Sequence, residues 1–369
     1  MRSSSNLHHE RPAALLGISL GVAFTLCFVT GLLSHAAQSH LPWFPWPSRP
    51  VWLYRVTQGT HVLTGLATIP LLLAKLYTVH PRLWRRPPVQ GIAHAVERVA
   101  LVPLVAGALL LLVTGVTNID YWYPYRFFFV TTHFWTAWIT IGALVAHVGA
   151  KYLVAGAALR DRAATSASSP AGIDRRRFLA AVAAASAAVV LTTVGSAFPP
   201  LGRLAVLSPR RPGTGPQGLP VNHDALSVGV PDHPDVPGYR LRVTGRVRRP
   251  LELTLQQLRA RGLREADLPV TCVEGWSVDA RWRGVPLRDL LEEAGADPRS
   301  PVVVRSLQTR GPYAGARIDA GHAHDPLTLL ALELNGAPLH PDHGFPVRLI
   351  APDTPGVLQT KWLKEVEVQ

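Results

Sequence analysis

Cysteine is nearly absent from this chain, with two residues in 369. Cys27 lies inside a long apolar run and Cys272 lies far outside it, so we expect no disulfide between them. No cysteine stands near His322 and His324, which leaves the residue set for a four-ligand zinc site incomplete. The sequence therefore predicts two free thiols and no zinc centre.

Acidic residues are also scarce, with 24 Asp and Glu against 37 Lys and Arg and a formal net charge of +13. Part of this positive charge lies in short loops between apolar runs, where basic residues indicate the orientation of membrane spans. Nucleic-acid binding would require a basic stripe on a soluble part of the chain, so we predict none. The glycine cluster at 213–218 is not followed by Gly-Lys-Ser/Thr, which excludes a phosphate loop and favours a hinge. The chain has no internal repeat.

Long apolar runs fill the first 200 residues. They lie at 13–34, 57–79, 93–117, 127–154 and 178–198. Each reaches the ~20 residues that cross a hydrocarbon core, and apart from Lys75, Glu97 and Arg98 they carry almost no charge. We predict an N-terminal all-α transmembrane bundle, with four spans in 1–155, a linker at 156–177 and a fifth, anchoring span at 178–198.

The loops between these runs predict their orientation. Arginines lie between the second and third runs, and basic residues lie between the fourth and fifth, including 175–177. By the positive-inside rule both loops and the N-terminus are cytoplasmic. The other two loops, at 42–47 and 121–125, are rich in aromatic residues and proline, which indicates loops at the outer membrane interface. Because there are five spans in the cell membrane, the C-terminal part is then predicted to lie outside the cytoplasm, on the periplasmic side.

The second cysteine lies in the segment Val-Thr-Cys-Val-Glu-Gly-Trp-Ser at 270–277. Further along, His343, Arg348 and Lys361 stand between turn residues. A soft thiolate suits a redox-active transition metal, and guanidinium and ammonium groups suit a phosphate-bearing ligand. Taken alone, the cysteine is equally well explained as a buried structural thiol.

With the motifs at 282–287, 334–339, 343–349 and 361–363, this segment resembles the molybdopterin domain of the sulfite oxidase family. The resemblance covers about residues 215–369, after a linker at 199–214. Within the family the cysteine context is closer to the periplasmic methionine sulfoxide reductases. It implies that Cys272 is the molybdenum ligand and that further residues surround the pterin and its phosphate, namely Asn222, Ser306, His343, Arg348, Gln359, Thr360 and Lys361.

Local patterns in this region predict an α+β domain. Alternation at 239–245 and the apolar run at 302–307 indicate strands, and 253–261 and 287–294 indicate short helices. About 155 residues suffice for one core.

The residues before the fifth run resemble an internal twin-arginine export signal. A small-residue linker at 163–170 precedes Arg175-Arg176-Arg177-Phe178-Leu179. A domain that acquires a large organic cofactor in the cytoplasm has to cross the membrane folded, which is the task of the twin-arginine machinery. The alternative is an ordinary positive-inside anchor. No cleavage site is favoured, so we expect the run to be retained.

Histidines inside the apolar runs give a second chemical signal. His133 and His147 are 14 residues apart, ~21 Å along a helix and within ~40° of one face. His61 matches the depth of His133, and His94, with His80 as competitor, matches that of His147. The pattern resembles cytochrome b-type membrane subunits, which implies one or two haem b groups. Polar packing between helices is the alternative.

The sequence thus predicts a membrane-bound molybdopterin-dependent oxidoreductase with two-electron, oxygen-atom-transfer chemistry, coupled through haem b to quinone. Its expected substrate is a sulfur compound such as a sulfoxide. Sulfite oxidation is an alternative, for which an anion pocket could come from Arg281, Arg283, Arg305 and Arg310. The other alternative is a non-catalytic haem electron carrier or sensor.

Overall fold

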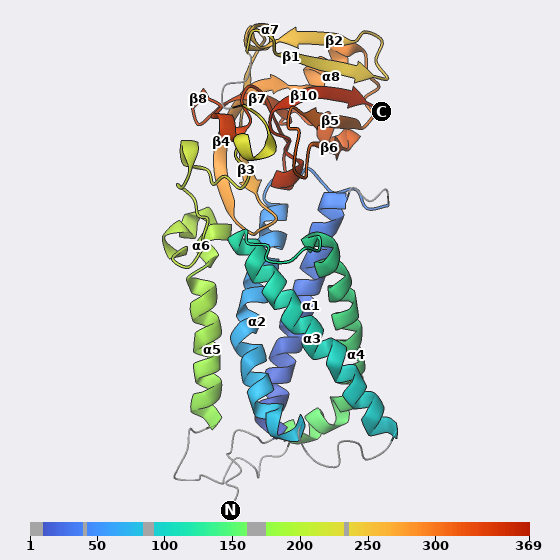
Figure 1. The fold of residues 1–369 in the computed structure, drawn as a ribbon, viewed down its shortest axis with the longest axis vertical. Helices are drawn as coiled ribbons and strands as arrows, with labels where there is room; N and C mark the ends of the chain where they lie inside the picture. The colour runs from blue at the N-terminus through green and yellow to red at the C-terminus, as the bar shows by residue number, and fades with distance from the viewer. Residues whose placement is uncertain (1–9, 40–42, 84–91, 161–174, 232–235) are drawn as a thin grey trace, which may run out of the picture. The chain divides into compact units, whose positions relative to one another are not determined.

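The computed structural model describes residues 10–39, 43–83, 92–160, 175–231 and 236–369 (Figure 1). The chain divides into two compact units. The first consists of Met1–Thr30 and Thr60–Thr193, and the second of Gly31–Gly59 and Val194–Gln369. The second unit therefore combines the C-terminal half of the chain with residues that connect the first two apolar runs.

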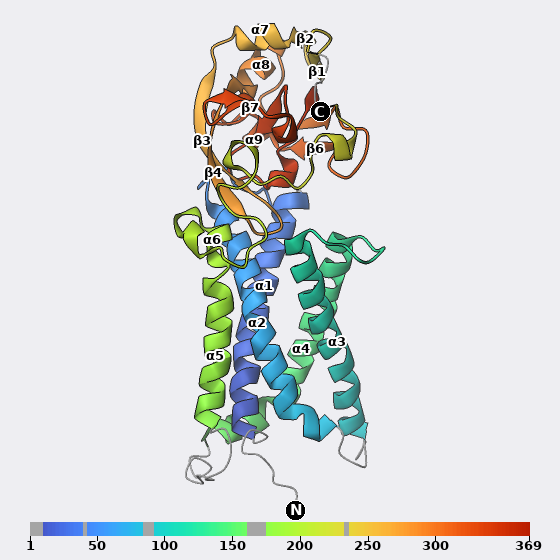
Figure 2. The ribbon, with the colours of Figure 1, turned by 60° about the vertical axis from the view of Figure 1, so that its left-hand side comes forward.

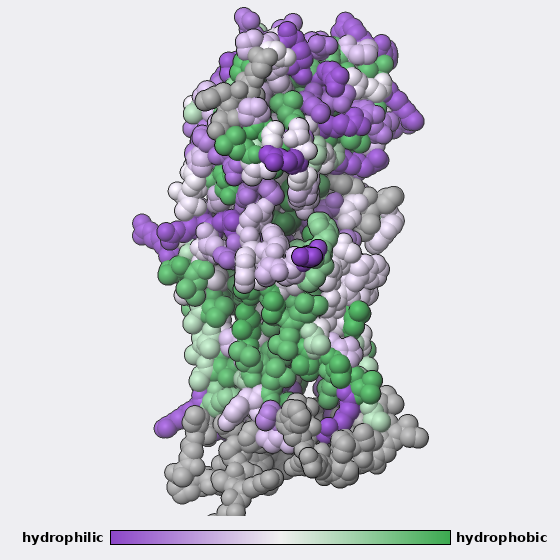
Figure 3. Space-filling model, viewed as in Figure 1, coloured by the Kyte–Doolittle hydropathy of each residue, from purple (hydrophilic) through white to green (hydrophobic). Residues whose placement is uncertain are grey.

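Long helices make up the first unit. They are α1 (Glu10–Ser39), α2 (Leu53–Leu83), α3 (Ile92–Asp120), α4 (Phe129–Arg160) and α5 (Arg175–Leu191), and α1 and α2 each contribute one end to the second unit. They run alongside one another (Figures 1 and 2). Each contributes a stretch that is long and apolar enough to cross a membrane, and hydrophobic side chains cover their visible surface (Figure 3). The predicted set of five apolar helices is confirmed.

Helices α3 and α4 pack closely at a glycine. A Cβ atom at Gly107 would lie 2.2 Å from the Thr140 Oγ1 atom, so a larger residue would force the helices apart. Small residues that let backbones approach are the usual basis of helix packing in membranes, where dispersion contacts replace the hydrophobic effect.

The second unit contains two sheets with helices and short 3-10 turns. The helices of the second unit are α6 (Val194–Ala197), α7 (Leu255–Arg259), α8 (Leu287–Ala294) and α9 (Ala320–Ala323). Its strands are β1 (Arg240–Gly245), β2 (Leu251–Thr254), β3 (Arg264–Thr271), β4 (Ser277–Pro286), β5 (Val302–Ser306), β6 (Gly315–Ile318), β7 (Leu329–Leu334), β8 (Ala337–Pro338), β9 (Arg348–Ile350) and β10 (Leu363–Val368).

The first sheet has the order β2-β1-β10-β5-β6, in which only the β1 and β10 pair is parallel. The second has the order β3-β4-β7-β8, and β9 also pairs with β7. The mixture of short helices and mostly antiparallel strands confirms the predicted fold class of the C-terminal domain.

Local sequence explains most of these elements. Along β4, buried and exposed side chains alternate, as expected for a strand with one face on a core. The helix predicted at 287–294 is α8, which ends where Gly295 adopts a left-handed conformation with φ +71°. The helix predicted at 253–261 is wrong at its start. Leu253 belongs to β2, because a capping box between Thr254 and Gln257 begins α7 only at Leu255.

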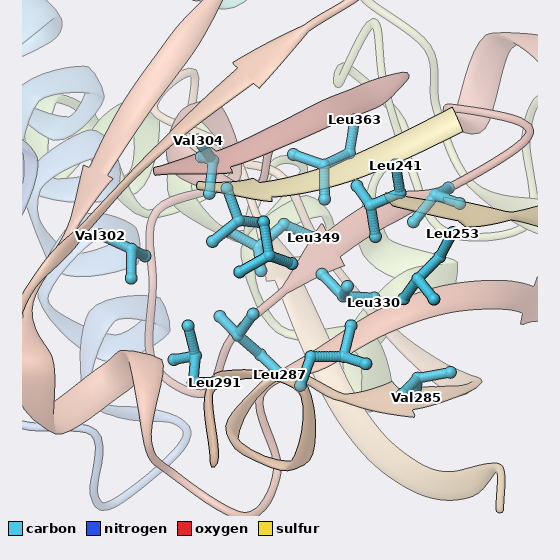
Figure 4. Packing of buried hydrophobic residues seen from close by; sticks show 14 of the residues in the cluster. Leu241, Leu253, Val285, Leu287, Leu291, Val302, Val304, Leu330, Leu349 and Leu363 are labelled. Atoms are coloured by element: carbon cyan, nitrogen blue, oxygen red, sulfur yellow. The ribbon is translucent and has the colours of Figure 1, made fainter. Parts of the chain in front are cut away.

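The main core lies between the strands and α8 (Figure 4). Leu241 and Leu253 come from the first sheet and Leu330 from the second, and Leu287 and Leu291 come from one face of α8. A second buried cluster includes Cys272, Trp276 and Trp282. The turn that carries the cysteine is therefore supported by packed aromatic side chains rather than by open loop.

Candidate active site

The cysteine occupies the turn between two paired strands. β3 ends at Thr271 and β4 begins at Ser277, and these two residues are paired across the ladder. The Cys272 amide donates to the Trp276 carbonyl at 2.9 Å, and the Gly275 amide donates to the Cys272 carbonyl at 3.1 Å. Gly275 has φ +97°, a conformation that favours glycine. The turn fixes the thiol, which is 6% exposed.

An amide and a carboxyl group lie beside this thiol. The Asn222 Nδ2 donates to the Cys272 Sγ at 3.3 Å and to the Glu274 Oε2 at 2.6 Å. The Trp276 Nε1 donates to the same carboxyl oxygen at 3.3 Å. Asn222 was expected here, whereas Glu274 was missed. The sequence feature that could have indicated Glu274 is that it is the one charged residue in the motif at 270–277.

Burial governs the protonation of both acids. Burial and the nearby Glu274 carboxyl raise the pKa of the Cys272 thiol. Burial also raises the pKa of Glu274 to about 7, although Arg210 and the Asn222 amide act in the opposite direction. Although the Asn222 amide and Arg210 favour the thiolate, burial outweighs them, and a metal ligated to the sulfur would stabilise the thiolate.

His343 and Arg348 form a second buried group. The His343 Nε2 donates to the Pro216 carbonyl at 2.7 Å, and burial and the Arg348 charge lower the pKa of the imidazole to about 3. The ring is thus neutral and its Nδ1 is an acceptor. The Arg348 guanidinium donates to the His343 carbonyl at 3.4 Å and lies 5.3 Å from the Trp282 ring centre. Burial lowers the pKa of Arg348 to about 10, so it stays charged.

Lys361 adds a further positive group. Its Nζ donates to the His223 carbonyl at 2.8 Å and to the Asp342 carbonyl at 2.7 Å. Burial and Arg348 lower the pKa of this ammonium to about 7. An anion against the Nζ would restore the charge, which suits a phosphate. Ser306 is joined to this residue, because its Oγ donates to the Lys361 carbonyl at 2.8 Å.

Gln359 and Thr360 bond mainly within their own loop. The Gln359 Nε2 donates to the Ala351 and Thr354 carbonyls at 3.3 and 3.1 Å, and the Thr360 Oγ1 donates to the Leu358 carbonyl at 3.5 Å. Asn222 and Cys272 are thus in direct contact, and Arg348 and Lys361 are near enough for the thiol to influence the pKa of each.

The polar atoms around the cysteine fit a heterocyclic, phosphorylated cofactor. Among the residues predicted to surround the cofactor, three buried atoms lack a hydrogen-bond partner within the described part of the chain, namely Asn222 Oδ1, Arg348 Nε and Gln359 Oε1. A buried polar atom without a partner is costly and calls for a ligand or water. Two acceptors and one donor beside cationic Arg348 and Lys361 match the mixed donors and acceptors of a pterin and the charge of its phosphate.

The histidines predicted as haem ligands lie on the long helices. His61 on α2 and His133 on α4 have ring centres 6.3 Å apart with planes at 71°. The His61 Nδ1 lies 2.8 Å from the Cys27 carbonyl, and the His133 Nδ1 lies 2.9 Å from the Thr114 Oγ1. His147 is on α4, but the side chain of His94 lies outside the described residues, so the second predicted pair remains a prediction.

The alternative anion pocket is not formed by the arginines that suggested it. Three of them pair with carboxylates: Arg281 with Asp267 at 3.3 Å, Arg283 with Glu333 at 3.1 Å and Arg305 with Glu365 at 3.1 Å. Arg310 donates to the Leu226 carbonyl at 3.3 Å. Because carboxylates neutralise three of these charges, this set of arginines does not supply the anion pocket that the sulfite alternative would need.

Known proteins resemble this chain in the region that contains the site. The family model described as "Oxidoreductase molybdopterin binding domain" matches residues 227–369. The protein-methionine-sulfoxide reductase catalytic subunit MsrP of Gluconobacter oxydans is 37% identical over 131 residues, which are 31% of this chain and 41% of that protein. Human mitochondrial sulfite oxidase is 35% identical over 159 residues, covering 39% of this chain and 27% of the relative.

The uncharacterized oxidoreductase YuiH of Bacillus subtilis is 31% identical over 153 residues, 41% of this chain and 76% of that protein. The chain thus spans less than half of the MsrP that it matches but most of the shorter YuiH. The match to the family model covers a C-terminal part of the chain that includes the cysteine turn. Five long apolar helices precede this domain. From the similarity of the domain itself, the chain belongs to the molybdopterin-dependent oxidoreductases of the sulfite oxidase and MsrP family.

Proposed function

We propose that this protein reduces a sulfoxide at molybdopterin ligated by Cys272, with electrons drawn from quinol through haem b held by His61 and His133. The observation that carries the haem assignment is the pair of imidazoles 6.3 Å apart between two apolar helices. Two metal–nitrogen bonds of about 2.0 Å each, with the distance from each nitrogen to its ring centre, account for roughly this separation.

The surroundings of the two rings support ligation. Each Nδ1 is engaged, one with a backbone carbonyl and one with a threonine hydroxyl, which leaves Nε2 of both rings for a metal. Hydrogen bonding at the far nitrogen is the usual way in which a protein orients a ligating histidine. Polar residues inside a membrane span are costly enough to indicate a function.

In the second unit, the residues around the cysteine turn would hold the cofactor and a proton. Cys272 would ligate the metal, Arg348 and Lys361 would bind the phosphate, and neutral His343 would accept a hydrogen bond at Nδ1. Molybdopterin supplies two-electron redox chemistry when bound. Glu274, whose pKa is about 7, can hold a proton at its carboxyl group beside the site.

The proton that Glu274 can hold favours a substrate that takes up protons as it is reduced. A sulfoxide takes two electrons and two protons to give a thioether and water, and protonated Glu274 is suited to one proton transfer. Three of the arginines considered for binding an anionic substrate are paired with carboxylates. The name of the MsrP relative is consistent with a sulfoxide substrate.

We further propose that the N-terminus is cytoplasmic and the molybdopterin domain extracytoplasmic. Arg175, Arg176 and Arg177 open α5, and the small-residue linker at 163–170 that precedes them lies outside the described residues. These arginines would direct export of the cofactor-loaded domain by the twin-arginine machinery, and the helices would stay in the bilayer.

The test is purification of the full chain in detergent with measurement of molybdenum, molybdopterin and haem b. We expect all three, with quinol-dependent reduction of methionine sulfoxide exceeding oxidation of sulfite. His61→Ala and His133→Ala should each remove the same haem signal, because one iron needs both rings. Thr114→Ala is the matched control, which removes a hydroxyl that bonds His133 and the Leu110 and Leu111 carbonyls but leaves both imidazoles in place, and it should retain the haem.

Two results would contradict the proposal. Purified protein without haem would remove the quinol pathway, and a preference for sulfite would reverse the assigned direction. If both histidine variants keep the full haem absorbance, the rings are polar packing between helices.

A further inference from the structure

Residues 46–58, here called the outer segment, comprise the end of the connection from α1 and the start of α2, and they lie in the same unit as the molybdopterin domain. Trp46 and Tyr54 are 7% and 1% exposed. Both bond to Asp353 of that domain. The Trp46 Nε1 donates to the Asp353 Oδ2 and carbonyl, each at 2.9 Å, and the Tyr54 amide donates to the Asp353 Oδ1 at 2.7 Å. The outer segment is therefore fastened to the domain through one buried carboxyl group.

Two other side chains of the outer segment reach the cysteine turn. The Gln58 Nε2 donates to the carbonyl of Val273, the residue after Cys272, at 2.5 Å. The Arg55 Nε donates to the Ser277 Oγ at 2.9 Å, and this hydroxyl in turn lies 2.8 Å from the Thr271 Oγ1. The bond from Gln58 thus holds the turn at the Val273 carbonyl. The bond from Arg55 holds it at Ser277, where β4 begins, and through Ser277 at the end of β3.

The state of Gln58 indicates a positioning role rather than a gain in stability. The residue is 3% exposed, and its Oε1 has no hydrogen-bond partner among the described residues. A buried amide with one unsatisfied atom costs stability, so packing alone would be served better by an apolar side chain. The donor end is held against one carbonyl, and that carbonyl belongs to the cysteine turn.

Arg55 separates into two interactions. Its guanidinium bonds the buried Ser277 hydroxyl through Nε and also pairs with Asp279, whose side chain is 62% exposed. The exposed ion pair contributes little. The bond to Ser277 is the one that bears on the turn, because Ser277 is fully buried and adjoins Thr271.

We propose that Gln58 and Arg55 are positioning residues for Cys272, so that the outer segment, which includes the start of α2, forms part of the oxidoreductase site. The inference rests on the proposed function, in which Cys272 ligates molybdenum. Holding the turn from the outer segment sets where the thiolate sulfur lies relative to Arg348 and Lys361, which would grip the other end of the cofactor. Displacement of a reacting group by about 1 Å can cost roughly 100-fold in rate.

The experiment uses the full chain in detergent, with Gln58→Met as the main variant. Methionine keeps the length and burial of the side chain but removes the donor to Val273. We expect near-normal molybdenum content, changed g-values in the Mo(V) electron paramagnetic resonance spectrum, and a kcat for sulfoxide lowered about 10- to 100-fold, with a smaller change in KM.

Arg55→Lys and Asp279→Asn separate the two interactions of Arg55. Lysine keeps a positive charge for Asp279 but lacks the Nε donor to Ser277, so it should change the spectrum in the same sense as Gln58→Met. Asp279→Asn weakens only the exposed pair and should leave the spectrum and kcat as in the wild type. Arg49→Lys is the matched control within the outer segment, because Arg49 pairs with Asp325 at 3.0 Å.

Wild-type spectra and kcat in both Gln58→Met and Arg55→Lys would overturn the inference. Equal effects from Arg49→Lys would also overturn it, since attachment of the segment in general, rather than its hold on the turn, would then matter. If Gln58→Met does not accumulate, Arg55→Lys decides alone. A wild-type protein without molybdenum would instead refute the proposed function.

Discussion

Asp353→Asn probes the buried carboxyl group that fastens the outer segment. Asp353 is 3% exposed and accepts hydrogen bonds from the Trp46 indole and the Tyr54 amide. Burial raises the pKa of this carboxyl from 3.8 to about 7, although both donors act in the opposite direction. The folded protein therefore holds the proton more tightly than the unfolded chain.

The sign of the pH effect follows from that difference. A raised pKa in the folded state means that the stability contribution is intact below about pH 4, falls as the pH rises, and levels off above about pH 7. At 1.36 kcal/mol per pKa unit, a shift of about 3 units corresponds to about 4 kcal/mol in full, of which about 2–3 kcal/mol is lost between pH 5 and pH 8.

The asparagine variant has no titrating group at this position. The amide nitrogen of the asparagine replaces one carboxyl oxygen and is itself a donor, so it faces the N–H donor of either the Trp46 indole or the Tyr54 amide. Loss of that hydrogen bond lowers the free energy of unfolding by about 1 kcal/mol. The Trp46 Nε1 keeps the Asp353 carbonyl as acceptor. By pH 5 the wild type has already lost somewhat more than this amount, so we expect the variant to be about as stable as the wild type at pH 5 and more stable than it by about 2–3 kcal/mol at pH 8.

The assay is thermal unfolding of the full chain in detergent, followed by tryptophan fluorescence at several pH values. The difference in Tm between variant and wild type should change by roughly 5–10 °C from pH 5 to pH 8. Asp267→Asn is the matched control, because that carboxylate is 77% exposed and pairs with Arg281 at the surface. Parallel curves for Asp353→Asn and wild type would refute the reasoning.

Three other changes test separate parts of the molecule. Cys272→Ser should abolish sulfoxide reduction while haem absorbance and membrane insertion stay unchanged, and substantial remaining activity would contradict the ligand assignment. Lys361→Met should lower the molybdenum content of purified protein several-fold, because it removes a cation near the cofactor, whereas Lys364→Met on neighbouring β10 should not; equal contents would place the phosphate elsewhere. Converting Arg175, Arg176 and Arg177 to lysine keeps the charge but not the guanidinium, and should leave the molybdopterin domain protected from external protease in spheroplasts; an exposed domain would favour insertion by charge alone.

Sequence alone determined the features that depend on local chemistry. Long uncharged apolar runs predict helices whatever surrounds them, since an unpaired backbone is too costly in lipid. The pattern at 287–294 predicted α8, alternation predicted β1 and an apolar run predicted β5, because each segment buries side chains against a core. The helix predicted at 253–261 began too early, since pairing with β1 extends β2 through Thr254.

Tertiary structure decided which distant side chains meet. Depth along the helices indicated that His61 and His133 belong together, but only the packed helices bring their rings to 6.3 Å. Three of the four arginines considered for an anion pocket are neutralised by Asp267, Glu333 and Glu365, and no local pattern reveals such pairs.

The outer segment is the clearest case of a feature that tertiary structure alone decided. Gln58 and Val273 are 215 residues apart in the chain, and neither has a composition or spacing that indicates the other. Aromatic and proline residues near Trp46 suggested a membrane-interface loop. Burial of Trp46, Tyr54 and Gln58 in the second unit depends on the shape of a folded domain, because a contact surface exists only after the strands and turns that form it have packed.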